Sequence, residues 1–177
     1  MAEREKLIEL KDLQISFGTG KKKFVAVDHV NFDIYKGETF SLVGESGSGK
    51  TTIGRAILRI NPTSAGEIYF KGQKINGKIS KELDKEVIRK CQMIFQDPMT
   101  SLNPTMTVGK QIMESLRIHR HLDKKQAREE AIKMLKMVNI PSPEKRIDSY
   151  PHEMSGGMRQ RVMIAMALAC SPKILIA

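Results

Sequence analysis

The sequence predicts an α/β fold that combines a mostly parallel central sheet, an N-terminal antiparallel layer of strands and a helical subdomain. Three observations support this. Strand-like patterns fill the first third of the chain, and a compact apolar run then passes through a glycine-rich turn into a helical pattern. A long segment of helical periodicity precedes a final short apolar run.

The antiparallel layer is predicted from β-favouring residues that alternate with turn signals. Segments 7–10 and 13–17 are rich in such residues, residues 18–23 break the pattern, and 24–34 resume it. A hairpin-like stretch follows at 66–72. Short strands joined by turns at this spacing favour antiparallel pairing.

The central part of the chain alternates strands and helices. The run 38–43 is a predicted strand that leads into the glycine-rich turn. The apolar spacing over 51–60 predicts a helix that ends at Asn61–Pro62. A charged helix over 81–89 then leads into an apolar strand over 91–95.

The last third is predicted to be mainly helical. The segment 105–139 has Asp123 as a helix N-cap with Gln126 three residues later, and a second helix spans 156–170. The final residues, 174–177, form a strand. The predicted buried face of the first segment consists of Ala127, Ala131, Leu135 and Val138.

Composition narrows the class of protein. With 40% hydrophobic and 28% charged residues in 177, one globular domain is expected. The apolar stretch Val162–Cys170 is about half of what a bilayer requires, and the first six residues lack a signal peptide's apolar segment, so we expect neither a membrane span nor export. Cys91 and Cys170 have no metal-binding spacing and are predicted to be buried thiols.

The net charge of +10 has more than one interpretation. The lysines are spread along the chain, with one run at 21–23, as expected for a solvated polar surface. The charge also fits attraction to a polyphosphate, a nucleic acid or an anionic membrane. Composition alone leaves these alternatives open.

The glycine-rich turn matches a phosphate-binding loop. Two glycines with four residues between them, Gly44 and Gly49, are followed by Lys50 and Thr51, between a predicted strand and a predicted helix. Glycines let backbone N–H groups curl around phosphate oxygens, Lys50 can reach the β- and γ-phosphates, and the Thr51 hydroxyl can ligate Mg²⁺. The alternative is a glycine turn that carries Lys-Thr by chance. The predicted nucleotide-contacting residues are Gly44, Glu45, Ser46, Gly47, Ser48, Gly49, Lys50, Thr51 and Thr52.

Two further segments resemble those of ATP-binding-cassette (ABC) proteins. Ser155–Arg161 is similar to their signature motif, and Met93–Pro98 to their Q-loop. The resemblance runs over essentially the whole chain and implies a P-loop NTPase fold. It also implies that two ATPase subunits pack head to tail, so that Ser155, Gly156 and Gly157 of one subunit cover the γ-phosphate held by the other.

The resemblance suggests a subgroup and a division of the chain. Tyr150–Glu153 and Ser101–Pro104 look like the ATPases of oligopeptide and dipeptide permeases. The chain is then one incomplete ABC domain, with a nucleotide-binding core at 1–96, a helical subdomain at 97–164 and a return to the core at 165–177. These importers use two related ATPase subunits, and both a divergent member and a joined pair of paralogues remain open.

The resemblance also implies roles for single residues. Gln96 would touch Mg²⁺ and the attacking water, which makes it a catalytic candidate beside Lys50. Phe17 would stack on adenine, and the alternative is that it belongs to the core. A helix of the permease would dock near the Q-loop, on Met99, Leu102 and Met106, which are therefore expected to be partly exposed.

The Walker B strand of the family carries a Mg²⁺-linked Asp and a catalytic Glu directly after its apolar residues. Here Ile174–Ala177 supplies the apolar residues and the sequence ends. The expectation is that the 177-residue chain binds Mg·ATP weakly and shows no ATPase activity above background. The histidines are not expected to act as the family's switch histidine; they are His29, His119, His121 and His152.

The resemblance predicts an ATP hydrolase of an importer for oligopeptides or dipeptides. Its cofactors would be ATP and Mg²⁺, and its partners a second ATPase subunit, the transmembrane permease and, indirectly, a substrate-binding protein. It would lie peripherally on the cytoplasmic face of the membrane, with no nucleic-acid partner. The alternatives are a soluble ABC-type ATPase that acts on nucleic acid or the ribosome, which the charge favours, and a nucleotide-binding fragment without turnover.

Overall fold

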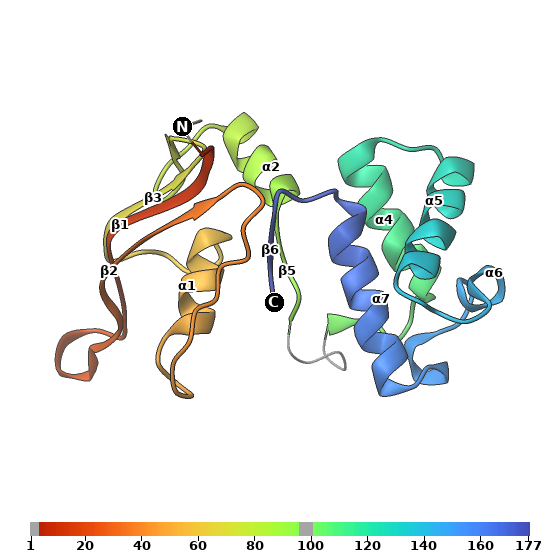
Figure 1. Cartoon of the computed structure of the whole chain (residues 1–177). Helices are drawn as coiled ribbons and strands as arrows, with labels where there is room; N and C mark the ends of the chain where they lie inside the picture. The colour runs from red at the N-terminus through yellow and green to blue at the C-terminus, as the bar shows by residue number, and fades with distance from the viewer. Residues whose placement is uncertain (1–3, 96–100) are drawn as a thin grey trace. The chain divides into compact units, whose positions relative to one another are not determined.

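The computed structural model describes residues 4–95 and 101–177. The chain forms two compact units, Met1–Cys91 and Gln92–Ala177 (Figure 1). The first carries the sheet and the glycine-rich turn, and the second is mainly helical. The finer division predicted from the sequence stays a prediction.

The first unit contains a four-stranded antiparallel sheet. Its strands are β1 (Lys6–Phe17), β2 (Phe24–Tyr35), β3 (Ala65–Phe70) and β4 (Gln73–Lys74), in the order β2-β1-β3-β4. This confirms the predicted antiparallel layer. The largest fully buried side chains on the sheet are Ile8, Leu10, Leu13, Ile15, Ile68 and Phe70.

Two predicted strands form a single strand that contains a bulge. Segments 7–10 and 13–17 form the single strand β1, whose register shifts between Leu10 and Leu13. Asp12 lies there at φ 50°, its N–H donates to Asn31 Oδ1 at 2.8 Å, and its carboxylate lies 2.6 Å from His29 Nδ1. This carboxylate raises the pKa of His29, which acts here as a structural residue of the bulge.

The segment 38–43 differs from its prediction. Among the described residues it pairs with no strand, and Val43 is 90% exposed. Phe40 stacks on Phe32 of β2 with ring centroids 4.7 Å apart. The apolar run is typical of a strand, but a strand also needs a neighbour with which it forms ladder hydrogen bonds. The local pattern does not show whether such a neighbour is present.

Two helices complete the first unit. Helix α1 (Lys50–Ile57) follows the glycine-rich turn, and α2 (Lys81–Lys90) is capped by Ser80, whose hydroxyl accepts from Leu83 N–H. Helix α1 ends three residues before its predicted end, because Arg59 takes a left-handed conformation with φ 61°. Arg59 Nε then donates to Asp84 at 2.9 Å, which fixes this end of α1.

The second unit is a helical bundle. Its helices include α4 (Val108–Arg120), α5 (Lys124–Met137), α6 (Pro143–Arg146) and α7 (Gly156–Ala169). Helices α4, α5 and α7 pack against one another (Figure 1). The capping box predicted at Asp123 is present. The predicted apolar face is buried in the core of this unit: Ala127, Ala131, Leu135 and Val138.

Two short strands lie side by side. Strand β5 (Cys91–Met93) pairs with β6 (Ile174–Ile176), and Ile94 N–H donates to the Ile176 carbonyl at 2.8 Å. The two run parallel (Figure 1). Cys91 is buried, as predicted, and burial raises the pKa of its thiol to about 12.

Within residues 4–95 and 101–177, no helix is both long enough and apolar enough to cross a bilayer.

Candidate nucleotide-binding site

The glycine-rich turn has the backbone that a phosphate-binding loop requires. Gly47 and Gly49 take left-handed conformations, with φ 83° and 89°, and Gly49 is the N-cap of α1. A Cβ atom at Gly49 would lie closer than 3.0 Å to the Ala26 carbonyl oxygen of β2. Both the φ angle and the close approach to β2 therefore restrict position 49 to glycine.

The start of α1 presents unused backbone donors. The first N–H groups of a helix, here those of Lys50, Thr51 and Thr52, have no acceptor inside the helix. Gly49 has no side chain to cap them. Helix N-termini of this kind attract anions, because N–H groups and the helix dipole point the same way.

The Lys50 ammonium group lies over the loop that precedes it. Its Nζ donates to the carbonyl oxygens of Gly44 at 2.7 Å and Glu45 at 2.5 Å, and to Ser48 Oγ at 3.1 Å. The cation therefore lies on the same loop as the free N–H groups of α1. This arrangement fits a polyphosphate, whose oxygens can accept from both.

The same loop offers one metal ligand. Thr51, at the second position of α1, is exposed. No group of three or more His, Cys, Asp or Glu side chains in the described part of the chain is arranged to hold a metal ion. A hydroxyl oxygen is a ligand that Mg²⁺ accepts when phosphate oxygens and water supply the rest of its shell. Gln96, the other predicted ligand, lies outside the described residues.

The second predicted anion site lies at the start of α7, in the second unit. Ser155 is the N-cap, and its Oγ accepts from Met158 N–H at 3.3 Å. Gly156 and Gly157 are exposed, and an added Cβ atom at either would meet nothing within 4 Å. The chain itself therefore gives no steric reason for two glycines there. The open space suits a ligand or partner that approaches the backbone.

These sites occur in a chain whose relationship to known proteins is clear. A family model described as "ABC transporter" matches residues 27–177, most of the chain. The chain belongs to this ABC transporter family. The match contains both anion sites, at the starts of α1 and α7.

Curated relatives of the ABC chain are oligopeptide transport proteins. The oligopeptide transport ATP-binding protein AmiF of Streptococcus pneumoniae serotype 4 is 56% identical over 98% of the chain and 56% of its own length. The oligopeptide transport ATP-binding protein OppD of Bacillus subtilis is 51% identical over 97% of the chain and 49% of its own. The chain thus spans about half the length of these relatives. The predicted resemblance to oligopeptide and dipeptide permease ATPases is confirmed.

Solved structures confirm the predicted α/β P-loop fold. The ATP-binding cassette MJ0796, in a dimeric post-hydrolysis state bound to ADP and Pi, matches with a TM-score of 0.85. It is 29% identical, and the match covers 96% of this chain and 72% of that one.

Phe17 is not a core residue. It ends β1, is 42% exposed and pairs with Phe24 of β2. The alternative that Phe17 packs into the core is therefore wrong. Its stacking on adenine stays a prediction.

The expected docking surface for the permease needs correction. Leu102 is 3% exposed and belongs to the core of the second unit, so the prediction that it is partly exposed is wrong. Met106 is half-buried, and Met99 lies outside the described residues.

The burial of Leu102 has a cause that the sequence did not reveal. Gln111 on α4 is 5% exposed, and its Nε2 donates to the carbonyls of Asn103 and Met106, each at 3.0 Å. Its Oε1 accepts from Asn103 N–H at 2.9 Å. These bonds fold the turn back onto α4. A glutamine between apolar helix positions was the only available signal.

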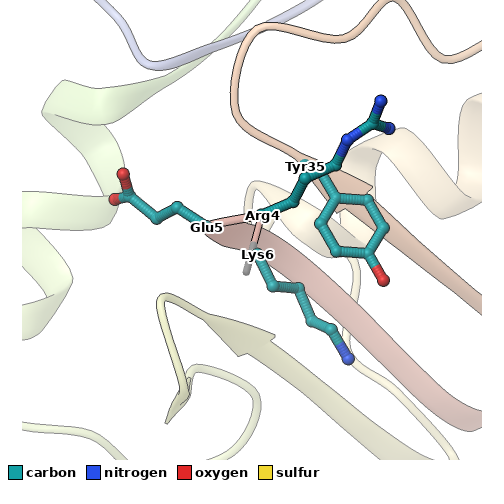
Figure 2. Close-up of a pocket in the computed structure, with 4 residues that line it drawn as sticks. All are labelled: Arg4, Glu5, Lys6 and Tyr35. Atoms are coloured by element: carbon teal, nitrogen blue, oxygen red, sulfur yellow. The ribbon is translucent and has the colours of Figure 1, made fainter. Parts of the chain in front are cut away.

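A pocket elsewhere on the first unit is not the nucleotide site. It lies at the start of β1 and is lined by Arg4, Glu5, Lys6 and Tyr35 (Figure 2). Lys6 pairs with Glu9 at 2.7 Å and with Asp33 at 2.8 Å. No predicted site residue lines this pocket, and its lysine is bound by carboxylates of the sheet.

We expect Ser155→Ala to destabilise the protein by about 1 kcal/mol, because alanine cannot accept from the Met158 N–H. Ser155→Gly is the matched control and should cost only a few tenths. Urea denaturation measures both. Equal stability of the alanine variant and the unmodified protein would show that the cap contributes nothing.

Proposed function

We propose that this ABC chain is the ATP-binding part of an importer subunit that couples ATP binding and hydrolysis to uptake of oligopeptides or dipeptides. The observation that carries the proposal is the loop before α1, where the Lys50 ammonium group and unused N–H groups lie together. The printed names of the relatives, which are oligopeptide and dipeptide transport proteins, support the substrate class.

The residues would divide the work of binding. The loop 44–52 holds the phosphates, with Lys50 on the β- and γ-phosphates. Thr51 and Gln96 orient Mg²⁺, and Phe17 stacks on adenine. ATP supplies the phosphoryl group whose transfer to water drives the cycle. Ser155, Gly156 and Gly157 would cover the γ-phosphate of a second ATPase subunit.

The partners follow from this role. The second ATPase subunit would pack head to tail, as two exposed anion sites in one chain suggest. A transmembrane permease would anchor the pair at the cytoplasmic face of the membrane. A substrate-binding protein would act indirectly, through the permease.

The test is peptide uptake in the source organism. Deletion of the gene is expected to abolish uptake of labelled oligopeptides or dipeptides, and restoring the intact gene should recover it. A Lys50→Ala gene should not. Unimpaired uptake in the deletion strain, together with salt-sensitive binding of DNA or RNA by the purified protein, would instead favour an ATPase that acts on nucleic acid.

A further inference from the structure

We propose that Phe24 is a second base-contacting side chain, which with Phe17 forms an apolar platform for the base of the nucleotide held by the loop 44–52. The inference rests on the proposed nucleotide binding and goes beyond it. It assigns a contact to Phe24, which is not among the residues predicted to bind the nucleotide.

The register of the sheet places the two rings together. Phe17 and Phe24 are paired residues at the end of the β1–β2 ladder that the connecting loop closes. Paired residues point to the same face of a sheet, with Cβ atoms about 4.5–5.5 Å apart. Phe17 is 42% and Phe24 62% exposed, so both rings present apolar surface to solvent.

The connecting loop holds this pairing by its tight geometry. Gly18 has φ 78°, and a Cβ atom there would lie closer than 3.0 Å to the Lys22 carbonyl oxygen. Within the loop, Lys23 N–H donates to the Gly20 carbonyl at 3.2 Å. Only glycine at position 18 lets the chain reverse closely enough to bring Phe24 opposite Phe17.

The platform lies on the face of the hairpin turned toward the phosphate loop. Ile15 pairs with Val27, and both are buried. A Cβ atom at Gly49 would lie 3.2 Å from Val27 Cγ2, so this face meets the start of α1. Phe17 is two residues from Ile15 along β1 and therefore points to the same face.

The distance along the strand suits one nucleotide. The carbonyl of Ala26 lies against Gly49. Phe24 is two residues from Ala26 along β2, a distance of about 7 Å in an extended strand. Phosphates held at the start of α1 would leave the base to reach outward along β2. Two exposed rings at that distance offer the base an apolar, planar surface on which to stack.

Two lysines beside the platform also favour a nucleotide as its ligand. Lys22 and Lys23 are exposed in the loop between the two phenylalanines. Cations beside an aromatic pair attract a ligand that is anionic at one end and flat and apolar at the other. A nucleotide has both properties.

The test compares three variants of the full chain by calorimetric titration. Phe24→Ala and Phe17→Ala are each expected to weaken binding of a non-hydrolysable ATP analogue about five- to tenfold. Both should bind inorganic triphosphate within about twofold of the unmodified protein, since triphosphate needs only the loop 44–52. Val25→Ala is the matched control, because Val25 is 44% exposed but pairs with Ser16, one position along the ladder. It should change neither affinity.

The outcomes separate this inference from the proposed function. If the unmodified protein binds neither ATP analogue nor triphosphate, nucleotide binding itself is wrong. If Phe17→Ala weakens ATP binding and Phe24→Ala does not, the second contact is wrong and the rest stands. Phe24→Leu keeps the apolar bulk and removes the ring, so it tests the contact without the risk of misfolding. It should have the urea midpoint of the unmodified protein and still bind ATP more weakly. Unchanged affinity for ATP would overturn the inference.

Discussion

Lys50→Ala is expected to weaken binding of a non-hydrolysable ATP analogue by roughly 100-fold or more. The variant loses the only side-chain cation on the loop. Each hydrogen bond to a charged group contributes about 1.5–3 kcal/mol to the binding free energy. Lys50 Nζ has three acceptors on the loop, at 2.5–3.1 Å, and phosphate oxygens would take their place. Calorimetric titration with the ATP analogue measures the loss.

The control for this variant is Lys85→Ala. Lys85 is exposed on α2 and belongs to no part of the predicted site, so its loss removes one charge and leaves the loop intact. It should bind the analogue within about twofold of the unmodified protein. Equal affinities for the Lys50 and Lys85 variants would show that the loop is not the nucleotide site.

Gly49→Ala should destabilise the folded protein by about 2–4 kcal/mol and weaken nucleotide binding as well. Alanine at φ 89° is strained by about 1–3 kcal/mol, and its Cβ also meets the Ala26 carbonyl. Relief requires β2 and the start of α1 to move apart, which displaces the N–H groups of the loop. The free energy of unfolding in urea measures the first effect and titration the second.

Gly47→Ala is the matched control for Gly49→Ala. Gly47 has a similar φ of 83°, but an added Cβ would meet nothing within 4 Å. Only the backbone strain remains, which should cost about 1 kcal/mol. If both variants lose the same stability, the close approach of β2 to Gly49 is not a constraint on the fold.

The features predicted correctly are those that neighbouring residues specify. The capping box at Asp123, the helix that begins after Ser155 and the glycine-rich turn before α1 all depend on hydrogen bonds or steric limits within a few residues. The antiparallel layer was predictable in part, because short turns close the β1–β2 and β3–β4 hairpins, whereas the pairing of β3 with β1 joins segments far apart in the sequence. Local chemistry therefore located the two helix starts at which the anion sites are predicted.

The predictions that failed depend on distant contacts. The apolar pattern of 38–43 cannot tell whether another strand lies beside it. Leu102 was expected at a surface, but its burial depends on Gln111, nine residues away, whose hydrogen bonds turn the chain inward. Spacing in the sequence contains neither fact.

The hydrogen bonds of Lys50 also have a consequence for the rate of nucleotide binding. The ammonium group and the carbonyls of Gly44 and Glu45 already hold the loop in a closed curve before any ligand arrives. Ordering a flexible loop costs about 1–2 kcal/mol for each residue fixed, and a loop ordered in advance avoids much of that cost at the moment of encounter. Association should then be limited by diffusion and charge attraction, and changes in affinity among loop variants should appear mainly as changes in the dissociation rate.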